Sequence, residues 1–158
     1  MEKPLSVAVA AVVRDGKILM IRRERGDYTG YWALPGGKVE QGEHVSESAE
    51  REILEETGLE TDFVSYEGIV SEIFGQKQFM LHVVELEPEG AEISGGDEGD
   101  VRWMEFESVE DEGVVPSDRK IISQVLQGSG GYFECVMTES DGKHSVESFD
   151  LKGRGFQD

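Results

Sequence analysis

The chain has 158 residues, and its 34 acidic and 15 basic side chains give a formal net charge of −19. This length fits one domain, residues 1–158, with a single sizeable core. The charge argues against a groove that follows nucleic-acid phosphates and against docking on anionic lipid. A single cysteine, Cys135, permits no internal disulfide and indicates a small buried thiol in a reducing compartment.

The first apolar segment runs from Leu5 to Val13 and is too short to cross a bilayer, which takes about 20 residues. Its length would suit the core of a signal peptide. However, Asp15-Gly16 is a hairpin turn signal, and a second apolar run follows at 17–21. Removal of the first strand would leave the second unpaired. We therefore expect an N-terminal hairpin in a cytoplasmic protein that has no membrane partner.

A Gly- and Tyr-rich loop, 26–32, leads to Gly36-Gly37, where a permissive backbone turns easily. A helix is expected over about 43–57, ended by Gly58 in the left-handed conformation. Three apolar residues at helical spacing give this helix a stripe that faces the core, namely Val45, Ala49 and Ile53.

The rest of the chain predicts further strands and a second helix. Strands are expected at 63–74, 78–86 and 100–106, with a turn near Gly75, and Ser117 is the expected N-cap of a helix that ends before Gly128. A terminal hairpin, 131–152, turns at Asp141-Gly142. Hairpins mixed with two helices indicate an α+β fold or an α/β/α sandwich around a mixed sheet.

The first helix is unusually acidic. It holds six glutamates between Glu43 and Glu56, with Arg51 as its only base, and Glu52, Glu55 and Glu56 crowd one side. Like charges at these spacings destabilise a helix by a few tenths of a kcal/mol per pair. A solvated acidic face is the simple interpretation. One arginine cannot neutralise three carboxylates, however, whereas Mg²⁺ or Mn²⁺ prefers such oxygen ligands.

Basic residues precede these carboxylates in the sequence. Gly36-Gly37 lets the backbone approach a metal or a phosphate, Lys38 follows at once, and Arg22 and Arg23 end the second strand. Carboxylates for a metal beside cations for a phosphate are typical of phosphoryl chemistry. We expect Arg22, Arg23 and Lys38 to bind substrate phosphates.

The same residues resemble a known family. The Nudix box is matched at every defining position. The matching residues are Gly37, Glu43 after an interval of five residues, and the run 51–59 after a further interval of seven. The flanking segments 31–37 and 101–103 are similar to MutT-like members. The resemblance in element order covers 5–127, so the terminal hairpin lies outside it.

The resemblance implies a Nudix-type α/β/α sandwich in which the box forms a loop, a helix and a loop. Members of the family hydrolyse a nucleoside diphosphate linked to another group, using Mg²⁺ or Mn²⁺. By position, Glu52, Glu55 and Glu56 would be the metal carboxylates, and the Gly37 carbonyl a further ligand. Arg51 would orient a helix glutamate.

The resemblance alone does not single out the general base. Glu52 is the first candidate, and Glu98 and Asp100 are alternatives that would otherwise be loop metal ligands or ordinary members of an acidic loop. Glu43 would be a secondary metal ligand or a group that positions the helix. The three histidines, at 44, 82 and 144, show no ligand spacing and receive no role.

The substrate class follows from the flanks of the box. A subgroup that acts on ADP-ribose carries a proline about sixteen residues past the box. Here the stretch 66–78 has none, and Pro88 is the nearest. The match before the box favours a nucleoside triphosphate, an oxidised one included, cleaved to a monophosphate and pyrophosphate. Four aromatic residues are candidates for stacking on a base, although packing is the simpler interpretation, namely Tyr28, Tyr31, Phe74 and Phe79.

Several alternatives stay open. An ADP-ribose or nucleotide-sugar pyrophosphatase would use the same mechanism, and a non-catalytic nucleotide or metal sensor would show broken box residues, which this chain does not. An enzyme for capped RNA would need a basic path that a charge of −19 disfavours. The terminal hairpin would be a homodimer interface, a wall of the substrate site or an extra sheet edge. The acidic surface is an ordinary solvated face or an adaptation to a salt-rich host.

Overall fold

The computed structural model describes residues 3–93, 100–126 and 131–153. Its strands form one mixed sheet in the order β3-β2-β1-β6-β5-β8-β9, with β4 paired to β1 and β7 paired to β2. The pairs β1–β6 and β5–β8 are parallel. The elements are β1 (Leu5–Arg14), β2 (Lys17–Arg22), β3 (Trp32–Ala33), β4 (Gly36–Lys38), α1 (Val45–Thr57), β5 (Thr61–Phe74), β6 (Lys77–Pro88), β7 (Val101–Glu105), a 3₁₀ turn (Phe106–Ser108), α2 (Pro116–Leu126), β8 (Tyr132–Ser140) and β9 (Lys143–Lys152).

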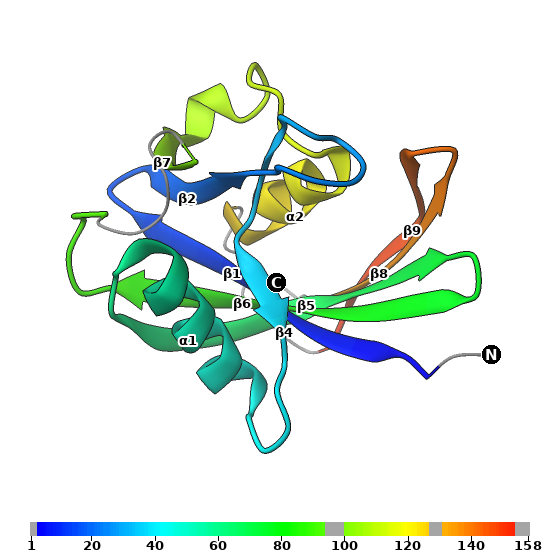
Figure 1. The fold of residues 1–158 in the computed structure, drawn as a ribbon, viewed down its shortest axis with the longest axis horizontal. Helices are drawn as coiled ribbons and strands as arrows, with labels where there is room; N and C mark the ends of the chain where they lie inside the picture. Colours follow the sequence, from blue (N-terminus) through cyan, green and yellow to red (C-terminus); the bar gives the residue numbers. More distant parts are fainter. Residues whose placement is uncertain (1–2, 94–99, 127–130, 154–158) are drawn as a thin grey trace.

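The two helices cover opposite faces of the central strands (Figure 1). Strand β1 shows why, because its side chains alternate between two cores. Ala8 and Ala10 pack with Ala49 and Ile53 of α1, and Ala8 and Ala10 are both fully buried. Val9 and Ala11 belong to the other core, which includes Ile121, Ile122 and Val125 of α2. The predicted α/β/α sandwich is confirmed.

Helix α1 begins at Val45, two residues later than predicted. The backbone N–H of His44 donates to the Glu47 carboxylate at 2.8 Å, which satisfies one of the free groups at this helix end. At the other end Gly58 adopts the left-handed conformation with φ 79°, and its N–H donates to the Leu54 carbonyl. The predicted C-cap is confirmed.

Two local predictions are wrong. Gly36-Gly37 does not form a turn but is part of β4, where Gly36 pairs with Val9 and Gly37 with Ala8. The need for glycine is close approach, since a Cβ on Gly36 would lie 2.1 Å from the Ala8 carbonyl oxygen. The second helix begins at Pro116, so Ser117 lies inside its first turn rather than at the N-cap. Proline is favoured at this first position because it has no N–H to satisfy.

The terminal hairpin continues the main sheet, because β8 runs parallel to β5. Its turn residues Asp141 and Gly142 both have positive φ, 53° and 76°, as the Asp-Gly signal predicts. Within the hairpin, Phe133 stacks on Phe149 at 5.0 Å, and the Lys120 ammonium of α2 lies over the Phe149 ring. Cys135 is buried in this core, as predicted. No helix in the described ranges is both long and apolar enough to cross a membrane.

Candidate active site

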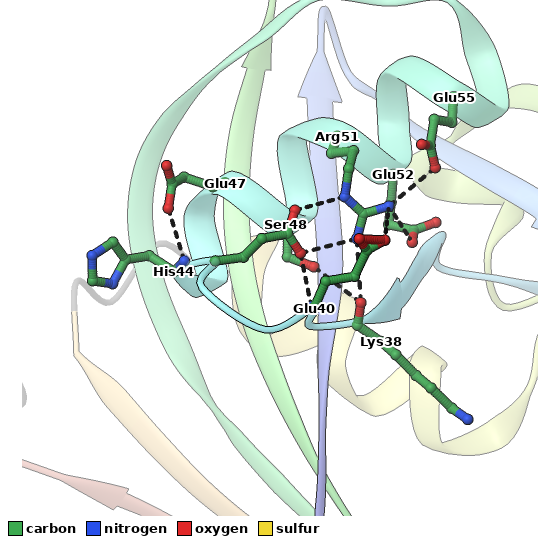
Figure 2. A network of polar contacts seen from close by, with 9 residues as sticks. Lys38, Glu40, His44, Glu47, Ser48, Arg51, Glu52 and Glu55 are labelled. Atoms are coloured by element: carbon green, nitrogen blue, oxygen red, sulfur yellow. Dashed lines mark hydrogen bonds and ion pairs between the residues drawn. The ribbon is translucent and has the colours of Figure 1, made fainter.

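Arg51 is the centre of the acidic face of α1 (Figure 2). Its Nε donates to Glu43 at 2.6 Å, and its Nη1 donates to Glu52 at 3.0 Å and to Glu55 at 3.1 Å. The Arg51 guanidinium lowers the pKa of Glu43 to about 2, mainly through this hydrogen bond. The network gives Glu52 and Glu55 fixed positions on the side of the helix that the sequence singled out.

Glu52 lies directly against the backbone of Gly37. Only 17% of its side chain is exposed, and a Cβ on Gly37 would lie 2.3 Å from the Glu52 carboxylate. Any side chain at position 37 would therefore push Glu52 away. The fold brings together the glycine backbone and the carboxylate that the sequence analysis named as oxygen donors for one metal.

Glu56 is a partly buried carboxyl group beside two other carboxylates of the box. Its Oε2 atom is buried and has no hydrogen-bond partner. Burial raises the pKa of Glu56 to about 7, and the neighbouring charges of Glu52 and Glu55 raise it further in the same direction. A cation bound between these carboxylates would remove the penalty.

The donor set suits a divalent cation that the substrate helps to hold. Within the described ranges, no three His, Cys, Asp or Glu side chains gather closely enough to form a metal cage by themselves. Mg²⁺ is usually bound by one or two carboxylates, with waters and substrate phosphates as its other ligands. Hard oxygen donors, an orphaned carboxylate oxygen and a close glycine backbone fit that arrangement.

A cavity of about 530 Å³ opens beside these carboxylates. Its charged lining consists of three arginines and four acidic residues, namely Arg22, Arg23, Arg25, Glu24, Glu55, Glu56 and Asp100. The Arg22 guanidinium lies 4.7 Å from the centre of the Trp32 ring, which supports the arginine at the end of β2. The structure therefore places Arg22 and Arg23 beside the box glutamates, and it adds Arg25 to them.

The remaining predicted site residues do not all lie at this cavity. The Lys38 side chain lines neither this cavity nor the one below, and it points away from the glutamate network in Figure 2. Its carbonyl instead accepts a hydrogen bond from Arg51 at 3.3 Å. Asp100 lines the first cavity, and its carbonyl accepts from the backbone N–H of Arg22. Glu98 lies outside the described residues.

A second cavity of about 250 Å³ lies on the α2 face of the sheet. It shares Ile21 and Arg23 with the first cavity. Its polar lining comes mainly from Glu72 on β5, Asp118 on α2 and His144 on β9, and its apolar lining includes Val7, Val9, Leu34, Leu81 and Val115.

The polar groups of the second cavity have perturbed titration. Burial raises the pKa of Asp118 to about 6, although its Oδ2 accepts a hydrogen bond from the Leu34 N–H at 3.0 Å. Burial also raises the pKa of Glu72 and lowers that of His144. Carboxyls and an imidazole in an apolar pocket are typical of a ligand site.

Sequence reasoning missed these three residues, because they come from separate elements and share no spacing. The four aromatic candidates for base stacking line neither cavity among the described residues. Tyr28 instead packs edge-on against Tyr31, and its ring lies 4.8 Å from that of His144.

Comparison with known proteins gives consistent matches. The sequence pattern of the NUDIX domain matches residues 4–125. An ADP-ribose pyrophosphatase of Methanocaldococcus jannaschii is 40% identical over 106 residues, which are 64% of this chain and 60% of that protein. An oxidized purine nucleoside triphosphate hydrolase of Danio rerio is 30% identical over 105 residues, 65% of this chain and 67% of that protein. The crystal structure of a MutT protein from Bacillus halodurans superposes with a TM-score of 0.77 at 27% identity, covering 93% of this chain and 97% of that one.

Proposed function

This chain belongs to the NUDIX family and is a hydrolase of phosphorus-containing anhydrides, and we propose that it cleaves a nucleoside triphosphate to a monophosphate and pyrophosphate. Oxidised nucleotides are included in this class. Enzymes of the family generally use divalent metal ions and act on small nucleotides, and we propose Mg²⁺ or Mn²⁺ here.

The observation that carries the proposal is the pair of adjoining cavities. The first joins box carboxylates to three arginines, which suits a metal-bound chain of phosphates. The lining of the second combines apolar residues with a few polar ones, which suits a base. Because Ile21 and Arg23 line both, one nucleotide would reach from the base cavity to the phosphate cavity.

Each site residue has a definite task in this mechanism. Glu52, Glu55, Glu56 and the Gly37 carbonyl would hold the metal, which when bound neutralises the phosphates and lowers the pKa of a water. Glu52, fixed by Arg51 at 3.0 Å, would accept the proton of the attacking water.

Three other residues have proposed tasks at the phosphates. Arg22 and Arg23 would stabilise the charge on the departing pyrophosphate. Lys38 would have to swing toward the phosphates to contribute.

Asp100, which lines the first cavity, is the alternative general base within the described residues, and Glu98 is the other alternative.

The relatives support two substrate classes. The Danio rerio protein favours a triphosphate, whereas the Methanocaldococcus jannaschii protein favours ADP-ribose. The lack of a proline at 66–78 weighs against ADP-ribose. A non-catalytic sensor is the third candidate.

The test is a phosphate-release screen with Mg²⁺, with and without added pyrophosphatase. The panel contains the ordinary nucleoside triphosphates, 8-oxo-dGTP, ADP-ribose, NADH and dinucleoside polyphosphates. Release of pyrophosphate from a triphosphate, lost in Glu56→Gln, would support the proposal. Turnover of ADP-ribose alone would replace the substrate class, and no turnover with Mg²⁺ still bound would support the sensor.

We also propose a cytoplasmic protein, because its single thiol is buried and free. The hairpin extends the sheet to an edge at β9, where Val146 and Leu151 are 40% and 48% exposed. A homodimer through this edge is an open prediction that light scattering would test.

A further inference from the structure

The tip of the terminal hairpin reaches the second cavity. His144, the second residue of β9, is part of the cavity lining, next to Asp118 and Glu72. Residues 131–152 follow the range 4–125 that the family pattern matches. One wall of the cavity is therefore supplied by a segment outside the family-defining part of the chain.

His144 is held firmly in this place. Its imidazole Nδ1 lies 3.2 Å from the Ser117 hydroxyl at the start of α2, and its Nε2 lies 3.5 Å from the Glu139 carboxylate across the hairpin. Only 8% of the His144 side chain and 9% of the Glu139 side chain are exposed. The contact with the Ser117 hydroxyl and the burial of the side chain hold the imidazole against the cavity.

The hairpin tip is also anchored to the loop between β2 and β3. The backbone N–H of His144 donates to the Tyr28 hydroxyl at 3.1 Å, and the two rings lie 4.8 Å apart. A Cβ on Gly142 would lie 3.2 Å from an oxygen of Asp27, so the turn packs closely on this loop. Three elements distant in sequence thus fix one side chain at the end of the cavity.

We propose that His144 is a specificity-determining residue, which sets the depth of the base cavity and so the size of base that the enzyme accepts. This inference rests on the proposed function only in placing the base in the second cavity. A rigid wall discriminates by fit, and a change of one small group in such a pocket alters selectivity about 10- to 200-fold. His144 lines the second cavity and not the first, which contains Glu55 and Glu56, so its role is in recognition and not in the chemical step.

The test measures binding of the four monophosphates AMP, GMP, CMP and UMP by calorimetry, which needs no turnover. His144→Ala should change the ratio of purine to pyrimidine Kd by at least about 10-fold, because the space it leaves suits a larger base. Lys143→Ala, an exposed neighbour in the same turn, should keep the wild-type ratio. In the proposed triphosphate reaction, His144→Ala should change KM while kcat stays within about 3-fold.

His144→Gln keeps a polar side chain of similar length, so it should restore most of the discrimination, and it carries the test if the alanine variant does not fold. An unchanged ratio, equal weakening for all four monophosphates, or no binding to the wild type would overturn the role of His144. Binding with the expected change of ratio, but no hydrolysis of any triphosphate, would overturn the proposed function and leave this inference standing.

Discussion

Gly37 and Glu52 touch across the gap between β4 and α1, and a Cβ at position 37 would lie 2.3 Å from the Glu52 carboxylate. Gly36, one residue earlier, has a different neighbour, since its Cβ would lie 2.1 Å from the backbone oxygen of Ala8. Adjacent glycines therefore serve different purposes. One leaves room for a charged side chain, and the other lets two strands pair.

This difference predicts that replacement by alanine has different effects at the two positions. Gly37→Ala should lower kcat strongly with little loss of melting temperature, because a flexible carboxylate can move aside but then leaves the proposed metal site. Gly36→Ala should lower the melting temperature, because backbone must move. Steady-state kinetics and thermal melting of both variants check this. Equal stability losses in the two would contradict it.

We expect the Glu56 carboxylate to lower the stability of the metal-free protein while it is needed for activity. Its pKa is raised from 4.5 to about 7, so in the absence of metal the folded protein loses stability as the pH rises from about 4.5 through 7. Glu56→Gln removes this loss and should melt at a higher temperature than the wild type at pH 8 in EDTA, but not at pH 4. The same variant should lose activity with Mg²⁺. A lower melting temperature at pH 8 in EDTA would oppose this account.

The Asp118 carboxyl group should make the stability depend on pH in a second range. Its pKa is about 6 against an ordinary value of 3.8, so the unfolded chain releases the proton first and stability falls between about pH 4 and 6. Asp118→Asn lacks this loss. Its free energy of unfolding relative to the wild type should rise over that range by at most roughly 3 kcal/mol. The actual rise should be smaller than this limit, because the carboxyl group faces a cavity and is only partly buried. Urea unfolding at several pH values measures it, and a difference that does not vary with pH would refute it.

The net charge of −19 predicts a dependence on salt. Residues 61–158 hold 22 acidic and 7 basic groups. The repulsion is visible at Glu85, whose pKa is raised mainly by burial and additionally by the neighbouring charges of Glu67 and Glu87. Salt shortens the range of this repulsion from about 30 Å at 0.01 M to about 3 Å at 1 M. The melting temperature should therefore rise steeply over that range. A flat profile would mean that the carboxylates are dispersed enough to be harmless.

The sequence predicts the parts of this protein that depend on local pattern. The N-terminal hairpin, the stripe of Ala49 and Ile53, and the Gly58 cap all follow from turn signals and spacing, and all are found. Gly36-Gly37 was misjudged because glycine serves both turns and close approach, and only the neighbouring strand distinguishes the two.

The candidate site divides in the same way. The box carboxylates lie within one helix, so their spacing places them together. Glu72, Asp118 and His144 meet only through the sheet order, in which β8 joins β5 and brings the hairpin over α2. No local pattern in the sequence contains that arrangement.

The most direct test of the proposed mechanism is the rate of pyrophosphate release from a nucleoside triphosphate with Mg²⁺ by Glu52→Gln. Glu50→Gln is the matched control, with the same chemical change on the same helix outside the Arg51 network. Loss of the general base should lower kcat at least about 100-fold in Glu52→Gln and leave its fold intact, while the control stays near the wild type. Activity of Glu52→Gln within a few-fold of the wild type would contradict the account and move the base to another carboxylate.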